Sequence, residues 1–160
     1  MRFALVALML AAPVMAQEQV FDASVAEACL ESVGVAGQFE ECIGQAAERC
    51  MEESEGGQTT VGMSQCLQAE AQWWDTVLNA TYGELLAFSK EMDAENGEGV
   101  PSQEVALRDM QRAWIGYRDA RCGFEQSQWG RGSGAGPAVA ACLMQETAQQ
   151  ARVLKSALPE

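Results

Sequence analysis

One stretch of the chain, over residues 63–92, shows helical periodicity without interruption and is long enough to set the architecture of the whole fold. Its inward positions recur at alternating spacings of four and three residues, which is the spacing of one helix face. They are Leu67, Ala71, Trp74, Leu78, Thr81, Leu85 and Phe88. About thirty residues at 1.5 Å each form a rod of about 45 Å, so the stretch predicts one long helix.

A second long helix is expected to return alongside the first. Residues 93–99 are rich in acid and glycine, and a new helix should begin near residue 102, just after Pro101, and run to about residue 128. Two long helices joined by a short polar turn lie antiparallel. The inner side of the second helix is predicted to carry Leu107, Met110, Trp114, Tyr117 and Phe124.

A glycine-rich loop at residues 129–136 separates this hairpin from a final helix. Pro137 suits the first turn of that helix. Its predicted inward residues are Val139, Leu143, Ala151, Leu154 and Leu158. No segment shows the strict alternation of a half-buried strand. The sequence therefore predicts an all-α fold, a disulfide-stapled helical bundle built on a long antiparallel helical hairpin.

The region before the long hairpin is expected to form a smaller helical unit. It should contain a short helix over residues 24–33 and a second helix over residues 39–51. One face of the second helix carries Phe39, Cys42, Ile43, Ala46, Ala47, Cys50 and Met51. We interpret residues 17–59 as an N-terminal cysteine-bearing helical hairpin and residues 60–160 as a second helical domain.

Residues 1–16 have the three parts of a secretory signal peptide. Arg2 supplies the positive charge, a short apolar run follows, and small residues precede the expected cleavage after Ala16. A membrane anchor would need about 18 or more apolar residues, more than this run provides. A lipid anchor would need a cysteine directly after the cleavage point, but the first cysteine is Cys29. We expect a periplasmic or secreted protein without a membrane anchor.

The chain is strongly acidic, with 23 acidic and 10 basic residues and a formal net charge of −13. Removal of residues 1–16 would remove Arg2 and no acidic residue, which leaves a net charge of −14. This charge disfavours nucleic acid and anionic membrane surfaces as partners. It favours a basic protein partner and would speed the encounter with it. The alternative is that the charge only keeps an exported protein in solution.

Six cysteines in an exported chain indicate three disulfides. Cys42 and Cys50 are eight residues apart on one predicted helix, hence about 12 Å along its axis, which is beyond the limit of about 7 Å for a bridge. If neighbours in the sequence pair, each bridge spans a glycine-containing turn. Those pairs are Cys29 with Cys42, Cys50 with Cys66, and Cys122 with Cys142. The alternative is a Cys66–Cys122 link between the antiparallel long helices.

Two polar residues within the helical stripes, Asp75 and Arg118, are expected to meet across the long hairpin. If the hairpin turns near Gly97, residue 75 lies opposite residues near 119. The two side chains could then form a partly buried ion pair that determines the register of the helices. The alternative interpretation makes the same pair a ligand site.

The residue types argue against catalysis. The chain contains no histidine, which excludes serine–histidine and cysteine–histidine nucleophiles and histidine metal sites. Paired carboxylates serve glycosidases, but acidic residues are too abundant here for any pair to indicate such a site. We predict no catalytic residues, no metal site and no cofactor, and a protein that works by binding.

Two stretches of the long hairpin carry a resemblance to a known family. Residues 74–82 read Trp-Asp-Thr-Val-Leu-Asn-Ala-Thr-Tyr, and residues 111–122 contain the pattern Gln-Arg-Ala-Trp-x-x-Tyr-Arg-Asp-x-x-Cys. A glycine-rich loop and Cys142-Leu143 follow. Over about residues 60–158 the chain resembles the LprI-type lysozyme-inhibitor family, whose members are exported and helical. The resemblance implies an LprI-like domain and inhibition of lysozyme.

The resemblance and the charge indicate the same class of partner, because many lysozymes are basic proteins. We predict a binding protein that inhibits lysozyme-like cell-wall hydrolases; the alternative is a cell-envelope protein-interaction module without inhibitory activity. The candidate contact residues are Trp129, Arg131 and Ser133 in the glycine-rich loop. Their polar groups could meet the two carboxylates of a glycosidase cleft. The alternative is that the loop only connects two helices. The sequence makes no prediction of the oligomeric state.

Overall fold

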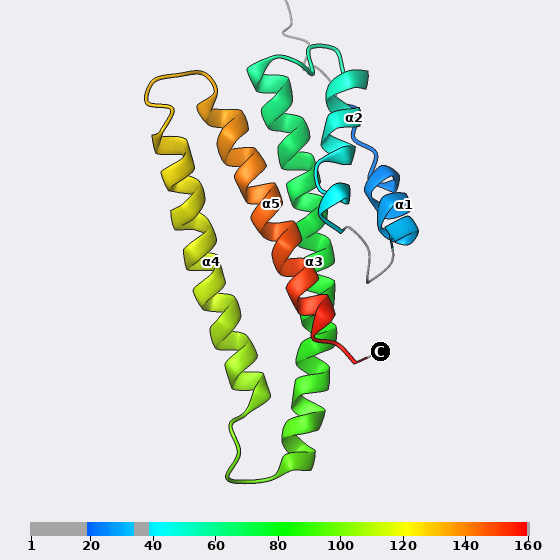
Figure 1. Ribbon diagram of the computed structural model, residues 1–160, viewed down its shortest axis with the longest axis vertical. Helices are drawn as coiled ribbons and strands as arrows, with labels where there is room; N and C mark the ends of the chain where they lie inside the picture. The colour runs from blue at the N-terminus through cyan, green and yellow to red at the C-terminus, as the bar shows by residue number, and fades with distance from the viewer. Residues whose placement is uncertain (1–18, 34–38, 160) are drawn as a thin grey trace, which may run out of the picture.

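A computed structural model describes residues 19–33 and 39–159, and in this part of the chain all regular elements are helical (Figure 1). The elements are α1 (Ser24–Val33), the 3-10 helix η1 (Phe39–Cys42), α2 (Gln45–Glu53), α3 (Thr60–Asn96), α4 (Gln103–Ser127) and α5 (Ala135–Ser156). The all-α prediction is confirmed. The expected signal peptide, at residues 1–16, lies outside the described residues.

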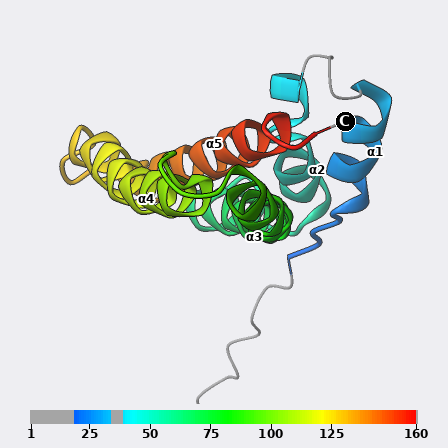
Figure 2. The ribbon, with the colours of Figure 1, turned by 90° about the horizontal axis from the view of Figure 1, so that it is seen from below.

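Helix α3 is the spine of the bundle, with 37 residues. The α3–α4 hairpin is antiparallel as predicted, but α5 packs along α3 more extensively than α4 does, and α4 packs mainly on α5 (Figures 1 and 2). Helix α2 covers the other side of α3, and α1 packs on α2 and η1 (Figure 2). The bundle is therefore centred on the α3–α5 pair rather than on the α3–α4 hairpin.

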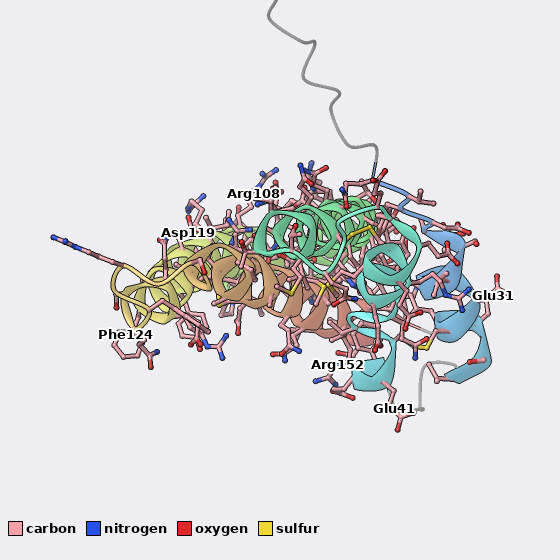
Figure 3. The ribbon with its side chains drawn as sticks, turned by 90° about the horizontal axis from the view of Figure 1, so that it is seen from above. Glu31, Glu41, Arg108, Asp119, Phe124 and Arg152 are labelled. Carbon is pink, nitrogen blue, oxygen red and sulfur yellow. A yellow bond between two sulfur atoms is a disulfide. The ribbon has the colours of Figure 1, made fainter. Side chains whose placement is uncertain are left out.

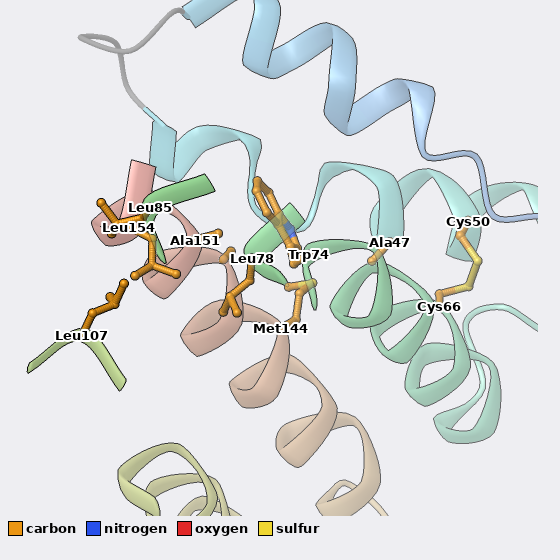
Figure 4. Packing of buried hydrophobic residues seen from close by; sticks show 11 residues of the cluster. Ala47, Cys50, Cys66, Trp74, Leu78, Leu85, Leu107, Met144, Ala151 and Leu154 are labelled. Atoms are coloured by element: carbon orange, nitrogen blue, oxygen red, sulfur yellow. A yellow bond between two sulfur atoms is a disulfide. The ribbon is translucent and has the colours of Figure 1, made fainter. Parts of the chain in front are cut away.

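The buried apolar core lies mostly between α3 and α5 (Figure 4). Trp74, Leu78 and Leu85 come from α3, as the sequence stripe predicts. From the other helices the core takes Ala47, Leu107, Met144, Ala148, Ala151 and Leu154. Trp74 is fully buried and packs against Phe39 with ring centroids 5.3 Å apart. The aromatic core therefore ties the N-terminal elements to α3.

The predicted inner face of α4 is largely wrong. Met110, Tyr117 and Phe124 were expected inside, but they are 40%, 58% and 67% exposed. The buried residues of α4 are Leu107, Gln111 and Cys122, and Trp114 is half-buried. The helix carries two apolar stripes, and only the one that contains Leu107 and Trp114 faces the bundle.

Polar contacts and a disulfide hold α4 against α5. The Arg121 guanidinium pairs with the nearly buried carboxylate of Glu146. The buried Gln150 amide donates a hydrogen bond to Gln111 Oε1. Part of the contact between α4 and α5 is therefore polar, whereas the sequence predicted apolar inward residues for each of these helices.

The three disulfides join neighbours in the sequence, with Cα separations of 5.5 to 5.6 Å. They link Cys29 with Cys42, Cys50 with Cys66, and Cys122 with Cys142, so the Cys66–Cys122 alternative is not realised. The Cys50–Cys66 bridge connects α2 to α3 across the boundary expected near residue 59. Stable structural disulfides are typical of an extracytoplasmic, oxidising compartment.

The helix predicted over residues 39–51 is broken in two at Gly44. This glycine has φ of 99°, in the left-handed region where other residues are strained. Two free N–H groups at the start of α2 donate hydrogen bonds to Glu70 of α3, which is fully buried. Its Oε1 accepts from Gly44 N at 2.6 Å and its Oε2 accepts from Ala47 N at 2.6 Å. The same Oε1 accepts from Trp74 Nε1 at 2.9 Å, so one carboxylate joins α2, α3 and the central tryptophan.

Asp93 organises the turn between α3 and α4. Its carboxylate accepts hydrogen bonds from Ser102 Oγ at 2.6 Å and from the backbone N–H groups of Gln103 and Glu104. These hydrogen bonds, the one from Ser102 first, lower the pKa of Asp93 below its ordinary value. The Asp93 carboxylate therefore caps the first turn of α4, where the helix dipole also favours a negative charge.

Two glycines of α3 provide a matched test of the packing between this helix and the preceding turn. A Cβ at Gly62 would lie 2.2 Å from the carbonyl oxygen of Gly56, whereas a Cβ at Gly83 would meet nothing within 4 Å. Gly62→Ala should lower the free energy of unfolding by about 1–3 kcal/mol, because backbone must move. Gly83→Ala should raise it by about 0.5–1 kcal/mol, because alanine loses less conformational entropy in a helix. Chemical denaturation with intact disulfides measures both. Shifts of the same sign would contradict the close contact at Gly62.

Candidate functional site

A groove of about 490 Å³ lies between α3 and α4 in the described part of the chain. Helix α3 contributes Asp75, Leu78, Asn79 and Tyr82. Helix α4 contributes Arg108, Gln111, Arg112, Trp114, Ile115 and Arg118. The groove therefore offers guanidinium, amide and aromatic groups, which can hydrogen-bond or stack on a partner. It contains no paired nucleophile and base.

Arg118 is the least exposed of the three arginines that line the groove. Its guanidinium lies 5.0 Å from the ring centroid of Trp114 and donates hydrogen bonds of 2.8 and 2.9 Å to the carboxylate of Asp119. Its side chain is only 21% exposed, against 71% for Arg112. Stacking on an indole and a two-nitrogen contact to a carboxylate both suit the planar guanidinium. The charge is therefore held in one place at the wall of the groove.

The predicted Asp75–Arg118 ion pair is not formed. Both residues line the groove, as the predicted register requires, but among the described residues no salt bridge joins them. Arg118 is held by its own neighbour Asp119, and the exposed Asp75 accepts a hydrogen bond from Asn79 at 2.8 Å. A carboxylate adjacent in the sequence reaches the guanidinium without crossing the groove. The groove is consequently open between the two side chains.

A double-mutant cycle tests this correction. Asp75→Ala and Arg118→Ala should have additive effects on the free energy of unfolding, within about 0.5 kcal/mol, because no salt bridge or hydrogen bond joins the two side chains. Arg118→Ala alone should cost about 1 kcal/mol, from the loss of a partly exposed ion pair and the stacking on Trp114. Chemical denaturation gives all four values. The control cycle pairs Arg118→Ala with Asp119→Ala, which should not be additive. If the coupling energy with Arg118 is larger for Asp75 than for Asp119, the Asp75–Arg118 ion pair does form.

The glycine-rich loop after α4 forms a preorganised series of turns. Gly132 N donates to the carbonyl oxygen of Trp129 at 2.8 Å, and Gly130 has φ of 55°. The Trp129 indole covers Gly134, where a Cβ would lie 2.1 Å from the ring. Trp129 nevertheless remains 48% exposed, and Arg131 and Ser133 are exposed as well. The three candidate contact residues are thus accessible on one short, ordered loop that does not line the groove.

Other kinds of site are not found in the described residues. No group of three or more cysteine, aspartate or glutamate side chains there could hold a metal ion. Within residues 19–33 and 39–159, no helix is long and apolar enough to cross a membrane. The groove and the loop are two candidate sites for a partner.

Much of the chain is similar in sequence to a known protein family. Residues 50–154 match the sequence profile of the family described as Lysozyme inhibitor LprI. The chain belongs to this family. An uncharacterized protein of Rhizobium meliloti (strain 1021) is 35% identical to this LprI-family chain over 97 residues, which cover 56% of the chain and 67% of that protein. No solved structure matches the chain.

The two stretches that carry the LprI resemblance meet in the groove. Asp75, Asn79 and Tyr82 from the first stretch lie opposite Gln111, Trp114 and Arg118 from the second. The cysteine of the second stretch, Cys122, forms the bridge to Cys142 of α5. Arg108, Arg112 and Ile115 also line the groove and were not predicted from the sequence. The signal for Arg112 and Ile115 was their position one helical turn from Arg108 and Arg118 on the same side of α4.

Proposed function

We propose that this chain is an exported inhibitor of lysozyme-like cell-wall hydrolases that acts by binding and has no catalytic activity of its own. The observation that carries the proposal is the match of residues 50–154 to the lysozyme-inhibitor family. Three disulfides also support it, since they suit a protein that acts outside the cytoplasm.

The charge of the chain supports a basic hydrolase as the partner. A net charge of −13 attracts a cationic enzyme over long distances and raises the association rate. Within the described residues, exposed acids cluster at the α2 end and at the α3–α4 turn, where Glu52, Glu53 and Glu55 and then Glu95 and Glu98 are found. Attraction of this kind selects the class of partner but does not form the short-range contact.

The loop with Trp129, Arg131 and Ser133 is our candidate for that short-range contact. Its exposed indole offers an apolar anchor, and the guanidinium and hydroxyl groups can donate hydrogen bonds to the carboxylates of a glycosidase cleft. Its turns are already closed by hydrogen bonds, so little conformational entropy would be lost on binding. The bridge between Cys122 and Cys142 holds the two helices from which the loop projects.

A binding assay and a lysis assay together test the proposal. The oxidised protein without residues 1–16 is immobilised, a basic lysozyme is passed over it, and lysis of cell walls by the same lysozyme is then measured with and without the protein. Binding with loss of lysis is the expected result. Binding without loss of lysis would indicate an envelope protein-interaction module, and absence of binding would reject lysozyme as the partner. A basic protein without glycosidase activity, such as cytochrome c, controls for attraction by charge alone.

A further inference from the structure

Helix α4 carries an apolar stripe that no other described element covers. It consists of Ala106, Met110, Ala113, Tyr117, Ala120 and Phe124, which we call the α4 seam. All six residues are exposed, and their spacing is four, three, four, three and four. Phe124 points away from the bundle on one side of α4, with Asp119 on the opposite side (Figure 3). This is the spacing of the apolar seam in a coiled coil, where a second helix covers the stripe.

The order of large and small residues in the seam specifies how a second helix fits. Large side chains occupy one of the two heptad positions, and alanine occupies the other. If two copies of α4 pair antiparallel about Ile115, each large residue lies opposite an alanine of the second copy. The opposed positions are Phe124 with Ala106, Tyr117 with Ala113, and Met110 with Ala120. A parallel pair would instead stack large on large and alanine on alanine, leaving voids at each alanine layer.

Two glycines border the seam on one flank, Gly116 and Gly123. Both are exposed, and a Cβ at either would meet nothing within 4 Å. Small residues beside an interface allow two helices to approach closely, toward the low end of the usual separation of about 8–10 Å. In an antiparallel pair this flank of one helix faces the same flank of the other. Without side chains at Gly116 and Gly123, the two helices can come close there.

The charge of α4 also favours a second copy of this chain over an external partner. The helix carries four arginines and four acidic residues, so its formal charge is zero in a chain of net charge −13. Two acidic molecules repel each other on most approaches. Because α4 itself carries no net charge, two copies of this helix do not repel each other, and the short-range apolar contact can form.

We propose that the α4 seam is the interface of an antiparallel, two-fold symmetric homodimer. In such an interface residue i contacts residue j of the second copy and residue j contacts residue i, as the large-to-alanine pairing requires. The proposal concerns the protein alone and does not depend on the identity of the hydrolase. It also leaves the 129–133 loop outside the seam.

Cysteine cross-linking distinguishes the antiparallel register from the alternatives. In that register the two copies of residue 116 lie beside the two-fold axis, within the reach of about 7 Å that a disulfide needs. The two copies of residue 123 are displaced by about 24 Å along the helices, at 1.5 Å per residue. Mild oxidation should therefore give a covalent dimer of Gly116→Cys and none of Gly123→Cys. Cross-linking of both would show a parallel pair, and cross-linking of neither would reject the interface.

Analytical ultracentrifugation of the unlinked protein completes the test. The wild-type protein should form a concentration-dependent dimer. Tyr117→Glu should raise the dissociation constant at least about 10-fold, because it places a charge in the centre of the interface. Val61→Glu is the matched control, since Val61 is 63% exposed on α3 and away from the seam, and it should dimerise as the wild type does. A wild-type protein that stays monomeric up to about 1 mM would overturn the proposal. So would a Tyr117→Glu variant that is folded by circular dichroism and still dimerises normally.

Discussion

Replacing Glu70 by alanine should lower the free energy of unfolding by about 3–5 kcal/mol, which is a large fraction of the stability of a typical domain. The side chain is fully buried and accepts hydrogen bonds from Gly44 N, Ala47 N and Trp74 Nε1. Alanine leaves all three donors without a partner and leaves a cavity between α2 and α3. Unfolding by guanidinium chloride, followed by circular dichroism with intact disulfides, measures the loss.

Two further variants separate hydrogen bonding from other effects at this position. Glu70→Gln keeps the volume but replaces one acceptor oxygen by a donor group, so its cost should lie between those of the wild type and Glu70→Ala. Glu84→Ala removes an exposed acid from the same helix and should change the stability by less than about 0.5 kcal/mol. If Glu70→Ala and Glu84→Ala are equally stable, the buried carboxylate does not hold α2 in place.

The burial of Glu70 could have been predicted from its position in the sequence. It lies four residues after Cys66 and four before Trp74, on the buried face of the predicted long helix. An acid at such a position needs buried donors, because a desolvated carboxylate without partners is strongly unfavourable. In a chain with 23 acidic residues, however, Glu70 differs from the other acids only by its position on the buried face of the helix. The donors themselves depend on the break at Gly44, which is a tertiary feature.

Local patterns predicted the elements well. The short helix over residues 24–33 and the long hairpin were expected from periodicity and turn residues, and both are present. The disulfides are the predicted pairs of neighbouring cysteines; helix geometry alone excluded only a Cys42–Cys50 bridge and left a Cys66–Cys122 link open. These features depend on residues close in the sequence, so spacing alone is informative.

The face that α4 buries was predicted less well, because it depends on partners far away in the sequence. Met110, Tyr117 and Phe124 have the spacing of a core stripe, yet α4 turns another face to α5. Periodicity indicates that a face will be covered and does not say by which helix or molecule. The same holds for Asp75 and Arg118, which reach one groove, while the contact of Arg118 with Asp119 replaces the predicted ion pair.

Replacing Trp129, Arg131 and Ser133 together by alanine should raise the dissociation rate of a complex with a basic lysozyme by roughly 100-fold. Loss of an apolar anchor and two polar contacts mainly shortens the lifetime of a complex. The residues are exposed and lie in a loop, so helicity and melting temperature should stay close to those of the wild type. Surface plasmon resonance gives both rate constants, and lysis assays give the inhibition.

Two companion measurements test the physical reasons separately. Gly134→Ala keeps all three side chains, but its Cβ would lie 2.1 Å from the Trp129 ring and so displaces the indole. This variant should also dissociate faster if the preorganised loop is the contact. Added salt should lower the association rate constant instead, because it screens charge attraction beyond about 8 Å at physiological ionic strength. If the triple variant still inhibits at wild-type strength, the loop only connects α4 and α5. The contact must then be sought at the acidic turns of residues 53–57 and 93–99, where opposite charge can act directly on a basic enzyme.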